Sequence, residues 1–430
     1  MEVSLQDILL AREQRVARQN VFLQAGYPII SFCMNIPGPV KNSPEIERAF
    51  YLGVSRLKDS LPILKEEIRS EHTGCEAIFS VDMPAQALKD FCIGLEDSLP
   101  LGRLWDMDVL TPTGEALTRS QHRGCLVCGK PGRLCAATRA HNITQLQQAT
   151  GQLIREYFAA SDCKAIGALA KESLIYEVNV TPKPGLVDRR NNGSHQDMDL
   201  PLFLKSAQAL ESYFTKAVEI GMTNPEPETC FSLLRQAGLD AEQAMFAATG
   251  GVNTHKGAIF TLGLLCGAVG ATWTPGVPFV GVQAVLSASR DMCYKALQAD
   301  LDRTGLPDTF GRQLYQDCGI TGIRGEAMAG FPHLLSALEF FEHNLHAGEN
   351  DAGLVTLLHL ISQIEDTNLY HRGGAQGAEF AKKRAKALLP NPKEEDILLL
   401  DDVFIEKNLS PGGSADLLAA TWFLHKLKYF

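Results

Sequence analysis

The sequence predicts two domains, an α+β domain over residues 1–162 and a mostly α-helical domain over residues 163–430. At 430 residues the chain is longer than a single hydrophobic core usually serves. Short β-prone runs are common before residue 162 and nearly absent after it, where apolar residues recur at helical spacing. The charge also changes: 17 Lys and Arg accompany 19 Asp and Glu up to residue 162, and the remaining 23 accompany 31, which gives −2 and then −8.

The composition disfavours several classes of protein. With 45% hydrophobic and 21% charged residues, the chain has the make-up of an ordinary globular protein. A net charge of −10 argues against a nucleic-acid partner. No apolar run reaches about eighteen residues and the N-terminus lacks the pattern of a signal peptide, so we expect a cytoplasmic protein with no membrane partner. The 11 cysteines, an odd number spread along the chain, favour reduced thiols over a disulfide framework.

The elements of the first domain alternate between helical and strand periodicity. Helical spacing of apolar residues predicts helices at residues 4–25, 44–69 and 85–97. Three β-prone runs predict strands at residues 28–36, 75–83 and 103–111. The first strand must stop at Pro37, because proline cannot continue a β-ladder. The residues after Gly114 are expected to return as the hairpin partner of the third strand.

Two aspartates on the third predicted strand indicate a metal site. Asp106 and Asp108 are two residues apart, so their carboxylates share one face of the strand. Neighbouring carboxylates repel each other unless a cation lies between them, and Mg²⁺ or Mn²⁺ bound to a triphosphate is such a cation. The Gly-Arg turn before this pair resembles the corresponding turn of nucleotidyltransferases. A chance pair of exposed aspartates is the alternative.

A cluster of cysteines follows. The spacing Cys125-x2-Cys128-x6-Cys135-x5-His141 fits a tetrahedral structural zinc site with a turn at residues 129–132. Reduced cysteines beside a turn are an equal alternative, because the spacing is not that of a standard zinc finger. A thioredoxin-like redox site is disfavoured, since no βαβ pattern surrounds the Cys-x2-Cys pair.

The second domain is expected to begin after a linker at residues 159–164, AASDCK, which are small and polar. Beyond it the sequence predicts eight to ten helices. The clearest lie at residues 166–178, 200–221, 230–248, 257–271, 282–302, 331–344, 351–366 and 377–389.

The stretch Thr181–Asp199 is the strongest candidate for a functional site in this half. Its prolines and its Asn-Asn-Gly sequence indicate a bent backbone. The stretch contains the cations Lys183 and Arg189 and, at alternate positions, the potential ligands His195, Asp197 and Asp199. A solvated loop is the alternative.

Related Gly-rich stretches with cations recur at residues 249–260, 322–332 and 365–374. Each adjoins a helix-like run, and phosphates bind readily at helix N-termini. Lys256, just before a buried helix, is therefore an expected phosphate contact. The alternative is that its glycines serve helix packing and Lys256 lies on the surface.

These motifs together resemble two enzyme families. Residues 10–15, 31–43, 101–115 and 125–141 resemble the apo-citrate lyase phosphoribosyl-dephospho-CoA transferase family. Residues 177–199, 235–265, 322–332 and 366–374 resemble triphosphoribosyl-dephospho-CoA synthase. The two resemblances cover nearly the whole chain, which implies a fused, bifunctional protein that makes and attaches the prosthetic group of citrate lyase.

The resemblance implies that the second domain takes ATP and 3'-dephospho-CoA, joins the ribose 2'-hydroxyl of dephospho-CoA to C1 of the ATP ribose and releases adenine. This step needs a base for the hydroxyl proton and an acid for the departing adenine. The carboxylates available for either role, or for Mg²⁺, are Asp188, Asp197, Asp199, Glu326 and Asp366. The residues expected to bind the substrate phosphates are Lys183, Arg189, His195, Lys256, Arg324, His371 and Arg372.

For the first domain the resemblance implies a nucleotidyltransferase-like fold. This domain would move the phosphoribosyl-dephospho-CoA group to a serine of the apo acyl carrier subunit of citrate lyase and release pyrophosphate. Asp106 and Asp108 would hold the metal, Arg103 would contact phosphate, and Lys41 is a weaker candidate for the same role.

Three alternatives stay open at this point. The first is the equivalent pathway of malonate decarboxylase, which uses the same prosthetic group. The second is a first domain that is a zinc-containing docking module without chemistry. The third, a nucleic-acid-directed nucleotidyltransferase, is disfavoured by the charge of −2 in that half.

Overall fold

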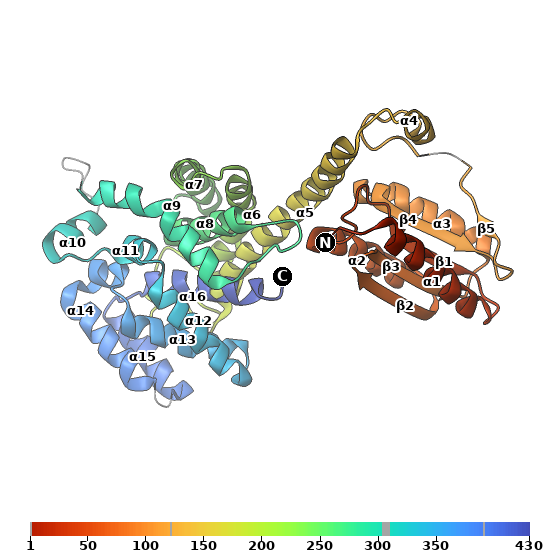
Figure 1. Cartoon of the computed structure of the whole chain (residues 1–430). Helices are drawn as coiled ribbons and strands as arrows, with labels where there is room; N and C mark the ends of the chain where they lie inside the picture. The colour runs from red at the N-terminus through yellow and green to blue at the C-terminus, as the bar shows by residue number, and fades with distance from the viewer. Residues whose placement is uncertain (1, 121–122, 303–309, 390–391) are drawn as a thin grey trace. The chain divides into compact units, whose positions relative to one another are not determined.

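The computed structural model describes residues 2–120, 123–302, 310–389 and 392–430. By their contacts, these residues form two compact units. Unit 1 contains Met1–Ala160 with Thr274–Val277, and unit 2 contains Ser161–Trp273 with Pro278–Phe430 (Figure 1). Among the described residues, no helix has both the length and the apolar character needed to cross a membrane.

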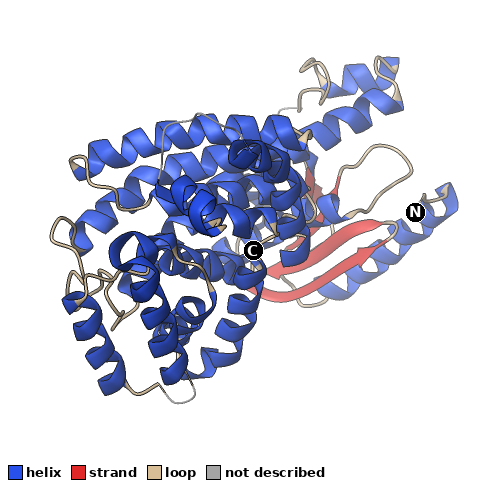
Figure 2. Cartoon of the chain, turned by 90° about the vertical axis from the view of Figure 1, so that its left-hand side faces the viewer, coloured by secondary structure: helices blue, strands red, loops and turns tan. Residues whose placement is uncertain are grey.

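Unit 1 contains a five-stranded antiparallel sheet, drawn in red in Figure 2. Its strand order is β2-β3-β1-β4-β5. The strands are β1 (Ile29–Met34), β2 (Ile63–Glu71), β3 (Gly74–Val81), β4 (Trp105–Leu110) and β5 (Ala116–Leu117). The helices of this part are α1 (Leu5–Leu23), α2 (Pro44–Ser60), α3 (Ala85–Ser98) and α4 (Gly132–Thr138), with a short 3-10 helix, η1 (Pro100–Leu104), before β4. The three predicted strands and the hairpin after Gly114 are confirmed, and the first domain is α+β as expected.

The helix expected over residues 44–69 is wrong in its second half. Helix α2 ends at Ser60, ahead of Pro62, and residues 63–71 form β2, which pairs with β3. The many charges of this segment suggested an exposed helix. Here they cover a strand at the edge of the sheet, where charged side chains discourage pairing with another chain.

The expected linker at residues 159–164 is also wrong, because it lies inside helix α5 (Ile143–Asn179). The helix continues because its next turns pack into the core of unit 2. Ile166, Ala170 and Leu174 recur at helical spacing and are buried there. Asp162 is buried as well, and its carboxylate accepts a hydrogen bond from Trp273 Nε1 at 2.7 Å.

Unit 2 is helical, as the sequence predicts. It packs around α8 (Lys256–Thr272), which is buried along most of its length. Helices α6, α7, α9 and α16 all contact α8. Besides α5 and α8, the helices of this part are α6 (Leu200–Thr223), α7 (Pro227–Thr249), α9 (Val282–Asp302), α10 (Phe310–Cys318), α11 (Gly322–Met328), α12 (Pro332–Asn344), η2 (Leu345–Ala347), α13 (Glu349–Gln363), α14 (Thr367–Leu388), α15 (Glu394–Glu406) and α16 (Gly412–Leu427).

The number and bounds of these helices differ from the expectation of eight to ten. The described residues from α5 to α16 form twelve α-helices, because α10, α11, α15 and α16 were not singled out from the sequence. Helix α14 begins at Thr367, about three turns earlier than expected. At Gly374, whose φ of 61° lies outside the helical region, a kink separates two helical segments, and the helix expected over residues 377–389 corresponds to the segment after it.

Candidate active sites

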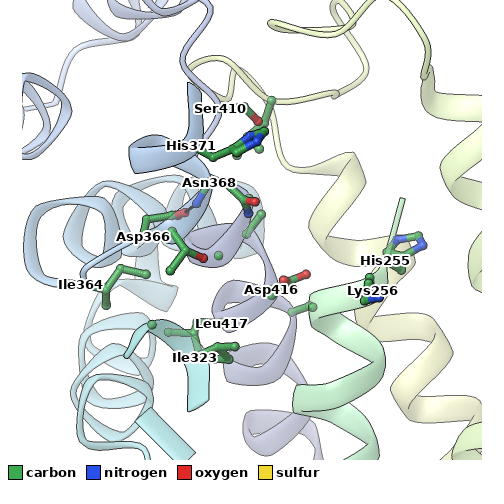
Figure 3. A pocket seen from close by; sticks show the side chains of 18 of the residues that line it. His255, Lys256, Ile323, Ile364, Asp366, Asn368, His371, Ser410, Asp416 and Leu417 are labelled. Carbon is green, nitrogen blue, oxygen red and sulfur yellow. Dashed lines mark hydrogen bonds between the residues drawn. The ribbon is translucent and has the colours of Figure 1, made fainter. Parts of the chain in front are cut away.

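Unit 2 contains a cavity of about 790 Å³ into which the Gly-rich stretches converge (Figure 3). Its walls come from the loop after α5, the start of α8, the start of α11, the start of α14 and the start of α16. Of the residues expected from the sequence, those that line it are Lys183, His195, Lys256, Glu326, Asp366, His371 and Arg372. Segments that are far apart in the chain therefore meet at one site.

Residues 182–188, the part of the loop that contains Lys183, are buried rather than solvated. Lys183 is 1% exposed, and its ammonium donates to the Glu177 carbonyl at 2.8 Å and to the Glu177 carboxylate. The Asp188 carboxylate accepts from Thr181 Oγ1 at 2.7 Å, from the Lys183 amide at 2.9 Å and from the Arg190 amide at 2.7 Å. Asp188 does not line the cavity, so its place in the fold is to hold this loop together.

His195 and Arg372 form a hydrogen-bonded pair at the cavity wall. Arg372 Nη2 lies 3.0 Å from His195 Nδ1, and Arg372 Nη1 donates to the Ser194 carbonyl at 2.8 Å. Burial, and then the charge of Arg372, lower the pKa of His195 to about 4. Because a guanidinium can only donate, Nδ1 is the acceptor and the proton is on Nε2, which donates to Ser410 Oγ at 2.9 Å.

Asp366 is buried at the meeting point of two helix N-termini. Its carboxylate accepts from the Asn368 amide at 3.0 Å in α14, and from the Ser414 amide at 2.8 Å and Ser414 Oγ at 2.9 Å in α16. Burial raises its pKa, and these hydrogen bonds lower it. With its lone pairs used in this way, Asp366 anchors the start of α16.

Asp416, on the first turns of α16, is a carboxylate that the sequence analysis missed. It is half-buried, lines the cavity and accepts from the Ala258 amide at the start of α8. Burial, and then the negative charges of Glu177 and Asp366, raise its pKa well above the usual range. In the view of Figure 3 it lies between Asp366 and His255. The Gly-Gly-Ser before it could have revealed it, as a helix start rich in small residues.

His255 is a second residue that the sequence analysis missed, next to the Lys256 that it chose. Its ring is 3% exposed, and Nδ1 lies 2.7 Å from Ser206 Oγ, which in turn accepts from Thr254 Oγ1. Burial lowers its pKa to about 3, with a smaller contribution from Lys183. Nε2 has no partner among the described residues. It is thus a neutral imidazole with a buried polar atom that has no partner among the described residues.

The remaining lining residues have partners of their own. Lys256 Nζ pairs with Glu242 at 2.8 Å, and its side chain is 57% exposed. Its backbone amide is capped by Asn253 Oδ1 at 3.2 Å. The Glu326 carboxylate lies 2.5 Å from His333 Nδ1 and also accepts from the His333 amide at 3.3 Å.

Four further expected residues of this half do not line the cavity. Asp199 caps α6 by accepting from the Leu202 amide at 2.9 Å. Asp197 is exposed, 4.0 Å from His195 Nδ1, and Arg189 is exposed beside Asn350. Arg324 is exposed on α11, because the helical period turns Ile323 and Glu326 to the cavity and Arg324 away from it.

In unit 1, Asp106 and Asp108 lie on the exposed face of β4, alternating with the buried Trp105, Met107 and Val109. Their pairing partners on β1 are Cys33 and Ser31 respectively. Partial desolvation by neighbouring atoms, and then the charge of Asp106, raise the pKa of Asp108. The two carboxylates therefore share one face, as their spacing predicts, and repel each other.

A hollow of about 380 Å³ in unit 1 is lined by Arg103, Arg119 and Arg123. The sequence indicated only Arg103, since the other two belong to a loop without a recognisable motif. Lys41 does not line this hollow, and its ammonium donates to the Ile36 carbonyl at 2.6 Å.

Next to this hollow, Cys125, Cys128, Cys135 and His141 come together. One ligand atom from each lies within 4.8 Å of all the others. Cys128 Sγ is 3.5 Å from Cys135 Sγ and 3.2 Å from His141 Nε2. The turn between the first two ligands is closed by the Gly129 amide, which donates to the Cys125 carbonyl at 3.0 Å. The four side chains could hold one metal ion.

Comparison with known proteins gives both halves a family. The family model for ATP:dephospho-CoA triphosphoribosyl transferase matches residues 163–430, and that for apo-citrate lyase phosphoribosyl-dephospho-CoA transferase matches residues 3–157. A Haemophilus influenzae protein called CitXG is 36% identical over 98% of this chain and 96% of its own length. A CitXG protein of Leuconostoc mesenteroides subsp. cremoris is 32% identical over 99% and 97%.

A Haemophilus ducreyi protein described as 2-(5''-triphosphoribosyl)-3'-dephosphocoenzyme-A synthase is 39% identical over 70% of this chain and 100% of its own. Both matching families are transferases. The chain therefore belongs to the family of bifunctional transferases in which a phosphoribosyl-dephospho-CoA transferase of apo-citrate lyase is fused to a triphosphoribosyl-dephospho-CoA synthase.

Proposed function

We propose that unit 2 converts ATP and 3'-dephospho-CoA to 2'-(5''-triphosphoribosyl)-3'-dephospho-CoA and adenine. We propose that unit 1 then transfers the phosphoribosyl-dephospho-CoA group to a serine of the apo acyl carrier subunit of citrate lyase and releases pyrophosphate. The two family matches support this order, because the product of one half is the substrate of the other.

In the synthase, Asp416 is the proposed general base. It takes the proton from the ribose 2'-hydroxyl of dephospho-CoA as that oxygen bonds to C1 of the ATP ribose. The bond from C1 to adenine breaks, and its electron pair stays with adenine. Adenine then takes a proton from His333, which Glu326 holds in place. The observation that carries this assignment is the raised pKa of Asp416 inside the cavity, whereas the lone pairs of Asp366 are used by helix N-termini.

The phosphates of both substrates are proposed to lie against Arg372, His371 and His195, with Lys256 at a more exposed position. A triphosphate normally arrives with Mg²⁺. Mg²⁺ would supply neutralisation of phosphate charge. In this proposal the substrates do not touch the expected residues that lie outside the cavity lining, which are Asp188, Asp197, Asp199, Arg189 and Arg324.

The test of the synthase is mass spectrometry of the products from ATP and dephospho-CoA. We expect free adenine and a dephospho-CoA product that has gained a triphosphorylated ribose. A product with a lost phosphate and no free adenine would contradict the reaction class.

In the transferase, Asp106 and Asp108 are proposed to hold Mg²⁺ or Mn²⁺, in a nucleotidyltransferase-like site. The shared face and the mutual repulsion of the two carboxylates support this proposal. The metal would neutralise the pyrophosphate as it departs. Arg103 is the proposed phosphate contact, whereas Lys41 is engaged with the backbone.

Replacing Asp106 or Asp108 by Ala should therefore abolish carrier loading while adenine release continues. Loading at the wild-type rate by either variant would show instead that unit 1 is a docking module or uses other residues. Incubation with the apo carriers of citrate lyase and of malonate decarboxylase would distinguish the two pathways, and we expect label only on the first.

The metal of the cysteine cluster is proposed to be Zn²⁺. Three cysteine sulfurs and one imidazole whose ligand atoms lie within 4.8 Å of one another suit zinc and are poor ligands for Mg²⁺. Elemental analysis of protein purified without added metal should give about one zinc per chain. Fully active protein without zinc would make these four residues ordinary reduced side chains.

Reduced thiols and ATP as substrate also lead us to place the protein in the cytoplasm.

A further inference from the structure

The hollow lined by Arg103, Arg119 and Arg123 borders the cysteine cluster, and neither family description assigns it a ligand. We propose that it binds the two terminal phosphates that leave as pyrophosphate, and that the zinc loop, residues 124–141, forms one wall and keeps it in shape. This inference rests on the transfer reaction and the zinc site proposed above.

Three arginines and one carboxylate, Asp97, line the hollow. Arg119 pairs with Asp97 at 2.5 Å and Arg123 pairs with the buried Glu96, but no carboxylate among the described residues pairs with Arg103. Burial, and then the charge of Arg123, lower the pKa of Arg103. A third positive charge without a counter-ion is what a diphosphate would neutralise, with two N–H groups of one guanidinium per phosphate.

The position of Arg103 depends on the zinc loop. Its Nε and Nη2 both donate to the Gly124 carbonyl, at 3.0 Å and 2.5 Å, and Gly124 directly precedes the ligand Cys125. Gly124 also forms an antiparallel bridge with Pro131. The Gly132 amide, at the start of the helix that contains the ligand Cys135, donates to the Arg123 carbonyl at 3.1 Å. Two of the three arginines are thus fixed through the backbone of this loop.

The loop has little else to hold it. Of its larger apolar side chains, Val127 and Leu134 are 37% and 56% exposed and Leu126 is only partly buried, and Cys135 is the buried ligand. A segment that buries so little apolar surface gains its order from the bound metal. Zinc would therefore set the shape of the arginine hollow without touching the substrate.

The hollow also adjoins the paired aspartates. Arg123 Nη1 donates to the carbonyl of Trp105, the residue before Asp106, at 2.6 Å. The charge of Arg123 acts on Asp108 as well, since it is one of the groups that lower its pKa. A diphosphate in the hollow is then next to the carboxylates proposed to hold the metal that neutralises it.

The first test compares Arg119→Ala with Arg133→Ala, a control on the exposed surface of the zinc loop that does not line the hollow. Arg119 pairs only with the 60% exposed Asp97, so its removal should not disturb folding. In carrier loading by the full chain, Arg119→Ala should raise both KM for the triphosphoribosyl substrate and the inhibition constant of pyrophosphate by about tenfold or more. Arg119→Lys should recover part of this loss. Arg133→Ala should have the wild-type values of both constants, and adenine release should be unchanged in all these variants. Unchanged constants in Arg119→Ala would overturn the pocket.

The second test concerns zinc. Cys128→Ser should lower the zinc content and raise the same two constants, but its added effect should be smaller in an Arg103→Ala background, because Arg103 is one of the two arginines that the loop holds. Full additivity of the two substitutions, or loss of zinc with unchanged constants, would overturn the coupling.

A third measurement does not depend on transfer activity. Pyrophosphate should slow the release of zinc to a chromogenic chelator in the wild type relative to Arg119→Ala, because ligand binding stabilises the state that binds it. Equal release rates would count against the pocket. If pyrophosphate slows zinc release but the wild type loads no carrier, the proposed transfer reaction is wrong and the pocket is not.

Discussion

Asp366 and Asp416 show how neighbours decide what a carboxylate can do. Both lie in the same cavity, and the pKa of each is raised by burial. The carboxylate of Asp366 accepts hydrogen bonds from backbone amides at the N-termini of α14 and α16. Asp416 accepts a hydrogen bond from one backbone amide and lies near the charges of Glu177 and Asp366. The first is suited to hold two helices together, and the second to exchange a proton.

Asp416→Asn should therefore slow adenine release by about 10²- to 10⁴-fold, the usual contribution of a general base. In the wild type the base must be deprotonated, so its raised pKa should make the rate fall, as pH is lowered, at a higher pH than an ordinary Asp would. The measurement is the pH dependence of adenine release by the full chain, with carrier loading as the control for the variant. A variant with wild-type rate and profile would remove Asp416 from the mechanism.

His255 predicts a pH dependence of stability. Its pKa is lowered to about 3 in the fold, below the ordinary value near 6.5. The folded state therefore takes up the proton less readily than the unfolded chain, and stability that is present above about pH 6.5 is lost as the pH falls. For a single group with these values the loss between pH 7 and pH 5 is about 2 kcal/mol.

The check is the melting temperature of the wild type and of His255→Gln at pH 7 and pH 5. Gln keeps polar atoms but cannot titrate, so the melting temperature of the variant should depend less on pH. Parallel loss of melting temperature in both proteins would mean that burial of His255 does not set this dependence.

Among the elements, the crossing of α6 and α8 depends on glycine. Gly221 in α6 lies against the Gly267 carbonyl of α8, and Gly270 in α8 lies against the Val218 carbonyl of α6, so that a Cβ at either glycine would collide with backbone. This approach brings α8 into the core, and the start of α8 supplies His255 and Lys256 to the cavity.

Gly221→Ala should destabilise the fold by about 1–3 kcal/mol, because the helices must separate to admit the methyl group. Gly238→Ala in α7 is the matched control. A Cβ there would meet only Tyr213 Oη at 3.5 Å and Ile259 Cγ2 at 3.9 Å. The control should gain about 0.5–1 kcal/mol from helix propensity. Thermal unfolding of the two variants gives both values, and equal stability would contradict the close crossing.

Strand β2 shows where periodicity misleads at the scale of elements. Its charges are spaced so that a helix and an exposed edge strand explain them equally well, and only pairing with β3 decides between them. Helix α5 is the opposite case. The small, polar AASDCK suggested a break, but neighbouring turns bury apolar residues on one side, and this packing outweighs weak local preferences.

At the scale of the whole molecule, the position of the division can be tested. We proposed separate domains at residues 1–162 and 163–430, and contacts divide the chain at Ala160 and Ser161 within α5. A fragment that starts at Cys163 loses Asp162, whose carboxylate is the partner of the buried Trp273 Nε1. A fragment that starts at Ser161 keeps it.

The Ser161 fragment should therefore be more stable than the Cys163 fragment by about 1.5–3 kcal/mol, the worth of a hydrogen bond to a charged group. Both fragments should release adenine from ATP and dephospho-CoA. Tryptophan fluorescence during thermal unfolding measures the first expectation, and product analysis the second. A soluble, helical Ser161 fragment without adenine release would mean that the synthase site needs residues of unit 1.

The sequence by itself determined the class of each half, the strands β1, β3 and β4, most helices of unit 2 and the grouping of Cys125, Cys128, Cys135 and His141, because periodicity and short-range spacing are local properties. It also indicated the stretches that meet at the cavity. Tertiary structure alone decided which of their polar residues face that cavity. Glu326 faces the cavity and Arg324 does not, because side chains two residues apart on α11 point to different sides of the helix. Asp416 became a candidate base only because Glu177 and Asp366, distant in the chain, lie beside it, and the charge and burial that raise a pKa depend on distances that no local pattern contains.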